Sequence, residues 1–138
     1  MIPSILTSIP RAIRTIRRVS ASELKNDLTF QQFRILNLVS EGMGQTQMAQ
    51  NVQVSMAAIS KTVEQLVAQK LLKREIGEDR RCHKLILTTE GKKVLKHVKA
   101  QVEKKIEVHY KKLSSKEKTE LAQGLKVLDK LIGFLNEK

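Results

Sequence analysis

The sequence predicts a mainly α-helical protein that carries one small β-hairpin. Apolar residues recur at three- and four-residue steps over most of the chain, which is the period of an amphipathic helix. Both prolines, Pro3 and Pro10, stand near the start, so no proline interrupts a helix in the remaining sequence. Only residues 72–87 alternate around a charged turn, as the strands of a hairpin do.

The composition is typical of a single globular domain with an aliphatic core, because aromatic residues make up only 3% of the 138 residues and Trp is absent. Cys82 is the only cysteine, which excludes an intrachain disulfide and fits a reducing cytoplasm. No apolar run approaches the roughly 20 residues that span a bilayer. We therefore expect a cytoplasmic protein with no membrane partner. The Arg-rich amphipathic start leaves a mitochondrial presequence or a membrane-surface helix as the alternative.

The net charge of +12 is high for this length and indicates a polyanionic partner, either nucleic acid or an anionic membrane surface. The basic excess is spread over the whole chain, so charge alone does not locate a binding surface. Lysines on solvated helix faces explain much of the excess in the last third of the chain.

Each helix has its own start or stop signal. An amphipathic helix is expected over residues 3–23, with Pro10 as an irregularity. Thr29 and Gln32 match a capping box that opens a second helix, which Gly42 ends. Ser114 with Glu117 matches another capping box for the last helix. A long helix is expected from Thr88 to about residue 112.

The centre of the chain predicts a helix-turn-helix followed by a hairpin. Thr46 is expected to cap a short helix over residues 46–51, and Ser55 to cap a longer one that runs to about Gln69. Ile59, Val63, Leu66 and Val67 form the buried stripe of that longer helix. Strands are expected over 72–76 and 83–87. A charged hairpin directly after a helix-turn-helix indicates a winged helix-turn-helix.

These residues resemble the MarR family of bacterial regulators. The matching stretches are LTFQQFRILNLV, TQMAQNVQVSMAAISKTVEQLVAQKLLKRE and EDRRCHKLILTTEGKKVL, within residues 28–95. The most specific part is Asp79-Arg80-Arg81 followed by Thr88-Thr89-Glu90-Gly91. The sequence departs from the family pattern at Lys70, where the family usually has Gly, and at the apolar residues 56–58. A left-handed Lys would cost about 1 kcal/mol, unless the local turn differs.

The resemblance implies that the helix after the turn lies in the major groove of double-stranded DNA. The expected recognition-helix contacts are Ser55, Met56, Ala57, Ser60, Lys61 and Gln65. Ser55 has the alternative of being only a cap. Thr46 and Gln47 are candidates for phosphate contacts, with ordinary capping as the alternative. In the wing, Arg81 is expected in the minor groove, with Asp79 orienting it and Arg80 in support.

The terminal helices carry more apolar surface than a small winged domain can cover, so pairing of two chains is expected, as the resemblance also implies. We assign residues 1–28 and 89–138 to dimerisation and residues 29–88 to DNA binding. The expected dimer contacts are Ile5, Ile9, Ile13, Ile16, Leu125, Leu128, Leu131 and Leu135. A two-fold dimer predicts a roughly palindromic operator.

The expected function is therefore that of a sequence-specific regulator, most simply a repressor, associated with the bacterial nucleoid. Release by a small aromatic or anionic effector is implied by the family; Arg14, Arg17 and Arg18 are candidates to attract an anion or are simply solvated. The alternative is a winged-helix interaction module with only non-specific DNA binding. No cofactor, metal site or enzymatic activity is expected, because His83, His97 and His109 are dispersed and no catalytic constellation occurs. Cys82 is inert or redox-active.

Overall fold

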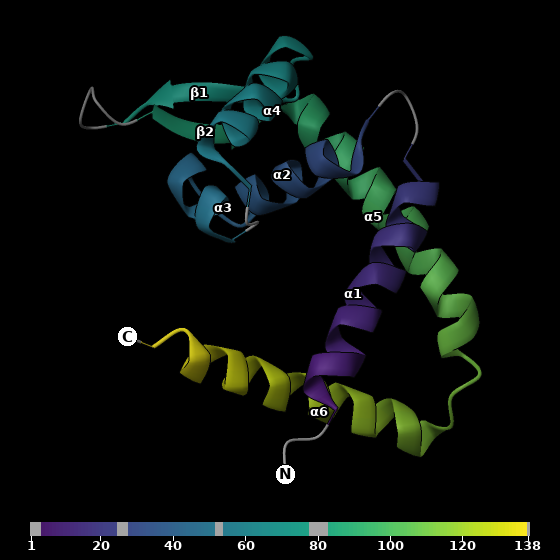
Figure 1. Cartoon of the computed structure of the whole chain (residues 1–138). Coiled ribbons are helices and arrows are strands. Elements are labelled where there is room, and N and C mark those ends of the chain that lie inside the picture. Colours follow the sequence, from purple (N-terminus) through teal and green to yellow (C-terminus); the bar gives the residue numbers. More distant parts are fainter. Residues whose placement is uncertain (1–3, 25–27, 52–53, 78–82, 138) are drawn as a thin grey trace. The chain divides into compact units, whose positions relative to one another are not determined.

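The computed structural model describes residues 4–24, 28–51, 54–77 and 83–137. The elements in chain order are α1 (Ile5–Ser22), α2 (Phe30–Ser40), α3 (Gln45–Asn51), α4 (Met56–Ala68), β1 (Leu72–Ile76), β2 (His83–Leu87), α5 (Thr89–Tyr110) and α6 (Ser115–Leu135) (Figure 1). The chain divides into two compact units, the first ending at Val102 and the second beginning at Glu103. The predicted fold class, mainly helical with one antiparallel hairpin, is confirmed.

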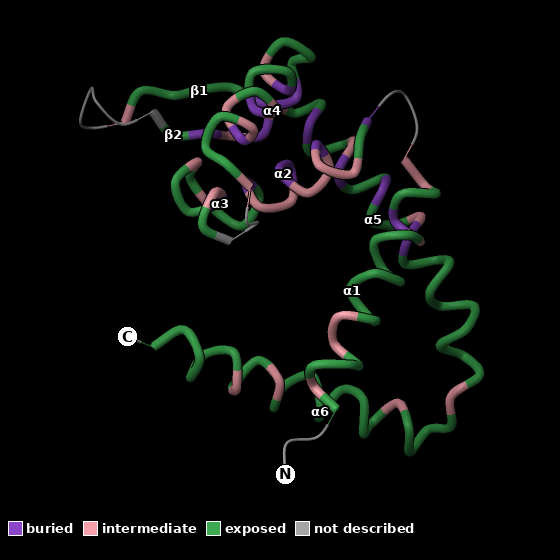
Figure 2. Tube along the Cα trace, in the orientation of Figure 1, coloured by how far each residue is buried: buried purple, intermediate pink, exposed green. Residues whose placement is uncertain are grey.

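The hydrophobic core lies in the first unit and is aliphatic, as the composition predicts. Figure 2 shows the buried residues gathered on α2, α4, the hairpin and the first half of α5. The core side chains that are completely buried are Ile35, Leu36, Met48, Ile59, Val63, Leu66 and Leu72. The stripe expected on α4 is therefore part of the core, with Val67 half-buried beside it.

Helix α2 begins and ends where the sequence predicts. The Gln32 amide donates to the Thr29 hydroxyl oxygen at 3.1 Å, and the Thr29 amide donates to the Gln32 side chain at 3.1 Å, which completes the capping box. Gly42 follows the helix with a φ of +88°, and the Met43 amide donates to the Leu38 carbonyl at 3.1 Å. Glycine suits this left-handed position because it has no Cβ to clash.

The start of α3 differs from the prediction. Thr46 does not cap the helix but is its second residue, because the helix already begins at Gln45. The Met48 amide donates to the Gly44 carbonyl at 3.0 Å, and the Gln47 side chain accepts a hydrogen bond from the Gly44 amide at 3.2 Å. Gly44 thus occupies the capping position that the sequence pattern assigned to Thr46, two residues too late.

The hairpin pairs Leu72 with Leu87 at its base and Ile76 with His83 toward its tip. Leu85 and Leu87 are buried, Ile86 between them is half-buried, and Lys84 before them is exposed. This alternation places one face of β2 on the core and the other in solvent. The expected strands are confirmed.

A joint connects the end of α4 to the start of α5. Lys70 has a φ of 61°, so it accepts the left-handed conformation at the position where the resemblance predicts Gly. The Thr88 hydroxyl donates to the Lys70 carbonyl at 2.6 Å and accepts from the Gly91 amide at 3.0 Å. A Cβ on Gly91 would overlap the Leu71 carbonyl oxygen. The Thr-x-x-Gly sequence therefore serves to pack the first turn of α5 directly on the backbone that follows α4.

The second unit contains the end of α5 and all of α6. Ser114 and Glu117 form the predicted capping box, with the Ser114 amide donating to the carboxylate at 2.9 Å. No described residue of α6 is buried (Figure 2). Of the helices that the structure describes, none is both long enough and apolar enough to cross a bilayer.

Candidate nucleic-acid interface and ligand pocket

Helix α4 has one face in the core and another in solvent. Ile59, Val63 and Leu66 are completely buried, and they hold the helix against the rest of the first unit. On the other face Met56 is 46% exposed, and Ala57 and Lys61 are also exposed. The N-terminal half of α4 therefore presents a short surface of small, apolar and basic side chains that no other described element covers.

Ser55 and Gln65, which are among the expected contact residues, also form hydrogen bonds within the chain. The Ser55 hydroxyl accepts from the Ala58 amide at 3.1 Å, which confirms its role as the cap of α4. Gln65 is exposed, and its side-chain oxygen accepts from the buried Gln32 amide group at 3.4 Å. That hydrogen bond joins α4 to α2, so the Gln65 side chain keeps only part of its hydrogen-bonding capacity for another partner.

Ser60 forms a hydrogen bond with a residue of α3. Its hydroxyl oxygen accepts a hydrogen bond from the side-chain amide of Gln45 at 3.2 Å, and both residues are half-buried. Gln45 is the first residue of α3 and lies fifteen positions away in sequence. The sequence pattern did not single out Gln45, because nothing local connects it to Ser60.

The remaining polar candidates lie at the start of α3 and in the wing. Thr46 and Gln47 are exposed at the first turn of α3. On β1, Lys73 forms an ion pair with Glu75 at 3.5 Å, and both side chains are about half exposed, so the pair adds little stability. Asp79, Arg80 and Arg81, together with Cys82, lie outside the described residues.

The residues expected at a dimer interface are poorly covered within the chain. Leu125 is 54% exposed and Leu135 is 74% exposed. In α1, Ile13 and Ile16 are each more than half exposed. The half-buried members of the set are Ile5, Ile9, Leu128 and Leu131.

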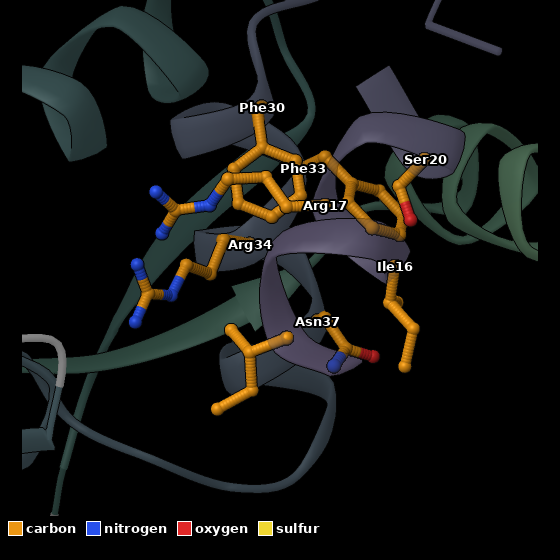
Figure 3. Close-up of a pocket in the computed structure, with 8 residues that line it drawn as sticks. Ile16, Arg17, Ser20, Phe30, Phe33, Arg34 and Asn37 are labelled. Atoms are coloured by element: carbon orange, nitrogen blue, oxygen red, sulfur yellow. The ribbon is translucent and has the colours of Figure 1, made fainter. Parts of the chain in front are cut away.

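A cavity of about 260 Å³ lies between α1 and α2 (Figure 3). Two aromatic rings form part of its wall, Phe30 and Phe33, whose centroids are 6.3 Å apart. Its remaining lining residues are Ile13, Ile16, Arg17, Ser20, Arg34 and Asn37. The oxygen Oδ1 of Asn37 is buried and receives no hydrogen bond from any described residue. This oxygen is therefore a buried acceptor that remains available for a hydrogen bond.

Two arginines give the cavity a positive end. The Arg17 guanidinium lies 4.9 Å from the centroid of the Phe30 ring, so this exposed side chain is also stacked on an aromatic face. Figure 3 shows the guanidinium groups of Arg17 and Arg34 pointing to the same side. Partial burial, and next the charge of Arg17, lower the pKa of Arg34. An anion placed between the two groups would offset their mutual repulsion and favour the charged form of Arg34.

In the part of the chain that the structure describes, no group of three or more His, Cys, Asp or Glu side chains lies together. His83 lies in β2, and His97 and His109 lie on exposed faces of α5.

No protein-family model and no curated protein matches the chain by sequence. Solved structures match over almost the whole chain. Wild-type apo MarR from E. coli has a TM-score of 0.77 at 21% identity and covers 93% of this chain and 97% of its own. A mutant of S. aureus MepR bound to an oligodeoxyribonucleotide has a TM-score of 0.62 at 22% identity, covering 91% and 97%. The Mycobacterium tuberculosis MarR family protein RV2887 with p-aminosalicylic acid has a TM-score of 0.71 at 20% identity, covering 88% and 95%. The chain has the fold of MarR-family regulators, as the sequence resemblance predicts.

Proposed function

We propose that the chain is a MarR-family transcriptional regulator that binds double-stranded DNA as a homodimer. The observation that carries the proposal is α4, whose buried stripe anchors it while its N-terminal half stays open to solvent, directly before a charged hairpin. This is the arrangement that places a recognition helix in the major groove. The binding of MepR, a protein of the same fold, to an oligodeoxyribonucleotide supports it.

The contacts of α4 would be few. Met56 and Ala57 suit contact with a thymine methyl group, whereas Lys61 suits guanine O6 and N7 or a phosphate. Thr46, Gln47 and Gln65 are proposed to bind phosphates, which positions the protein without reading sequence. Since α4 offers so few polar groups, we expect DNA shape and the wing to supply much of the specificity.

In the wing, Arg81 is proposed to enter the minor groove, with Asp79 orienting the arginine pair and Arg80 supporting it. Replacing Arg81 by Ala should weaken operator binding by roughly 1–3 kcal/mol and leave thermal stability unchanged. Lys126→Ala on the exposed surface of α6 is the control for loss of one positive charge. Equal operator affinity of the Arg81→Ala and wild-type chains would contradict this assignment.

Pairing of two chains would cover the apolar residues that α1 and α6 leave exposed. A symmetric dimer carries two recognition helices and therefore reads two half-sites about one helical turn apart. Sedimentation should give the mass of two chains at micromolar concentration. The mass of a single chain under these conditions would contradict the proposal.

The cavity between α1 and α2 is proposed to bind the effector that releases DNA. Its aromatic wall and its two arginines suit a planar aromatic acid, and RV2887, a protein of the same fold, binds p-aminosalicylic acid. Added p-aminosalicylic acid should release labelled operator from the protein. The Arg34→Gln variant should need about tenfold more of the acid, because it loses a charge-assisted hydrogen bond. Arg11→Gln, on an exposed part of α1, should respond like the wild type.

The experiment that tests the whole proposal is a genome-wide selection of bound DNA with the intact chain. A regulator of this kind should enrich one pseudo-palindromic motif, and the position of that motif relative to promoters would separate a repressor from an activator. Binding without any enriched motif would instead favour a winged-helix interaction module, for which the apolar residues 56–58 are the favouring feature.

A further inference from the structure

We propose that Gln45 reads a base of the operator, and that Ser60 acts mainly by positioning the Gln45 side chain. This inference rests on the proposed DNA-binding function and names a residue outside the recognition helix. It starts from the hydrogen bond that joins the Gln45 amide nitrogen to the Ser60 hydroxyl oxygen at 3.2 Å.

The position of this hydrogen bond matters as much as its length. Ser60 follows Met56 by one helical turn, and it lies between the exposed Ala57 and Lys61 and the buried stripe. Gln45 therefore meets α4 at the edge of the surface proposed to enter the major groove, away from the contacts of the core. It adds an amide group to a surface that is otherwise short of polar atoms.

The hydrogen bond also determines which donor and acceptor atoms of Gln45 and Ser60 remain available to DNA. One N–H of Gln45 and one lone pair of Ser60 are used between them. Among the described residues, nothing donates to the Gln45 carbonyl oxygen, and the Ser60 hydroxyl donates to no backbone carbonyl. Gln45 thus keeps one donor and one acceptor side by side, in an orientation that Ser60 restrains.

A donor beside an acceptor on one amide is the pattern that pairs with N7 and N6 of adenine. Restraint by Ser60 favours such a contact, because a free glutamine loses rotamer entropy when it binds. Ser60 alone, with its oxygen already accepting, would be a poorer reader of any base. The geometry therefore points to an A·T pair in each half-site that is specified from α3.

The test is the selection of bound DNA repeated with Gln45→Ala, Ser60→Ala and the double variant. Gln45→Ala should relax the preference for adenine at one position of each half-site about tenfold, as expected for loss of one bidentate contact. Ser60→Ala should relax the same position by less, and the double variant should behave like Gln45→Ala alone. Gln50→Ala, an exposed glutamine of the same helix, is the matched control and should leave the motif unchanged.

A merely structural hydrogen bond gives a different result. Its loss would weaken binding to all sequences alike and lower the unfolding midpoint, without changing the preferred base. That outcome, or relaxation at different positions in the two single variants, would overturn the inference. A wild-type chain that enriches no motif would overturn this inference together with the proposed function, whereas an unchanged motif in Gln45→Ala would overturn this inference alone.

Discussion

The first unit and helix α6 have the same kind of apolar periodicity, yet they differ in where the apolar side chains go. In the first unit the stripes of α2, α4 and α5 meet one another and enclose a core. In α6 no described residue is buried, and Leu125 remains 54% exposed. An amphipathic pattern therefore identifies a face that needs a partner, but it does not identify the chain that supplies the partner.

Helix α5 has apolar residues that are buried in the core and apolar residues that remain exposed. Leu95, Val98 and Val102 are buried, whereas Ile106 and Tyr110 further along the same stripe are 43% and 39% exposed. The change falls where the first unit ends and the second begins. The exposed part of this stripe adds to the apolar surface of α1 and α6 on which the dimer proposal depends.

The largest effect is expected from truncation within the core. Leu66→Ala should lower the free energy of unfolding by about 2–5 kcal/mol, because it leaves a cavity under a side chain that is completely buried. Glu64→Ala, at an exposed position of the same helix, is the matched control and should change it by less than about 0.5 kcal/mol. Denaturant unfolding measures both, and similar losses would contradict the assignment of the core.

The next largest effect is expected from a substitution in α6 that weakens the proposed dimer without changing the core. Leu125→Gln should weaken the proposed dimer by about 1.5–3 kcal/mol, because each of the two chains loses the burial of the exposed half of one leucine side chain. Sedimentation over a dilution series gives the change in dissociation constant. Hydrogen exchange should show unchanged protection of the α2 and α4 amides. A variant that remains dimeric with wild-type affinity would exclude Leu125 from the interface.

Gly91→Ala should destabilise the joint between α4 and α5 by roughly 1–3 kcal/mol, because the new methyl group meets a backbone carbonyl that cannot move aside. Gly124→Ala in α6 is the contrasting control, since its Cβ would meet no neighbour. In that helix interior, alanine should stabilise by roughly 0.5–1 kcal/mol. Thermal unfolding should shift in opposite directions for the two variants, and equal shifts would refute the close packing at Gly91.

Lys70→Gly should raise the free energy of unfolding by about 1 kcal/mol, because it removes the cost of a left-handed lysine. Gln69→Gly, one residue earlier and right-handed, should instead lower it by a similar or smaller amount. If urea unfolding shows no gain for Lys70→Gly, the left-handed backbone costs less at this site than it does elsewhere.

The smallest effect concerns the pH dependence of α6. Hydrogen bonds from Ser114, chiefly from its backbone amide, lower the pKa of Glu117. These hydrogen bonds therefore stabilise the start of α6 fully when the pH lies above the ordinary pKa of a glutamate carboxyl. Their stabilisation is lost as the pH falls through the lowered pKa of Glu117. Helix content followed by circular dichroism should show a small acid loss that Glu117→Gln abolishes. An identical acid profile in the variant would show that other groups are responsible.

The sequence is most informative where structure is local. The pairs Thr29 with Gln32 and Ser114 with Glu117 are three residues apart, so their capping boxes follow from the pattern itself. Thr46 shows the limit even at short range. A helix of seven residues has too little periodicity to locate its first turn, and Gly44 caps it with the help of the Gln47 side chain.

The parts that the sequence did not predict depend on contacts between distant residues. Gln45 meets Ser60 only because α3 packs on α4. Phe30 and Arg17 form a stacked pair only because α1 lies against α2. Since neither pair leaves a periodic signal, the α1–α2 cavity and the Gln45 contact required the three-dimensional arrangement.

The joint at Thr88 has a mechanical consequence. One hydroxyl group holds both the carbonyl of Lys70, just after α4, and the amide of Gly91, in the first turn of α5. Because these two hydrogen bonds share one hydroxyl group, the first turn of α5 is fixed to the backbone that directly follows α4. We expect a rotation of α5 to be passed on to α4 as a change in its tilt, whereas a longer connection would absorb it.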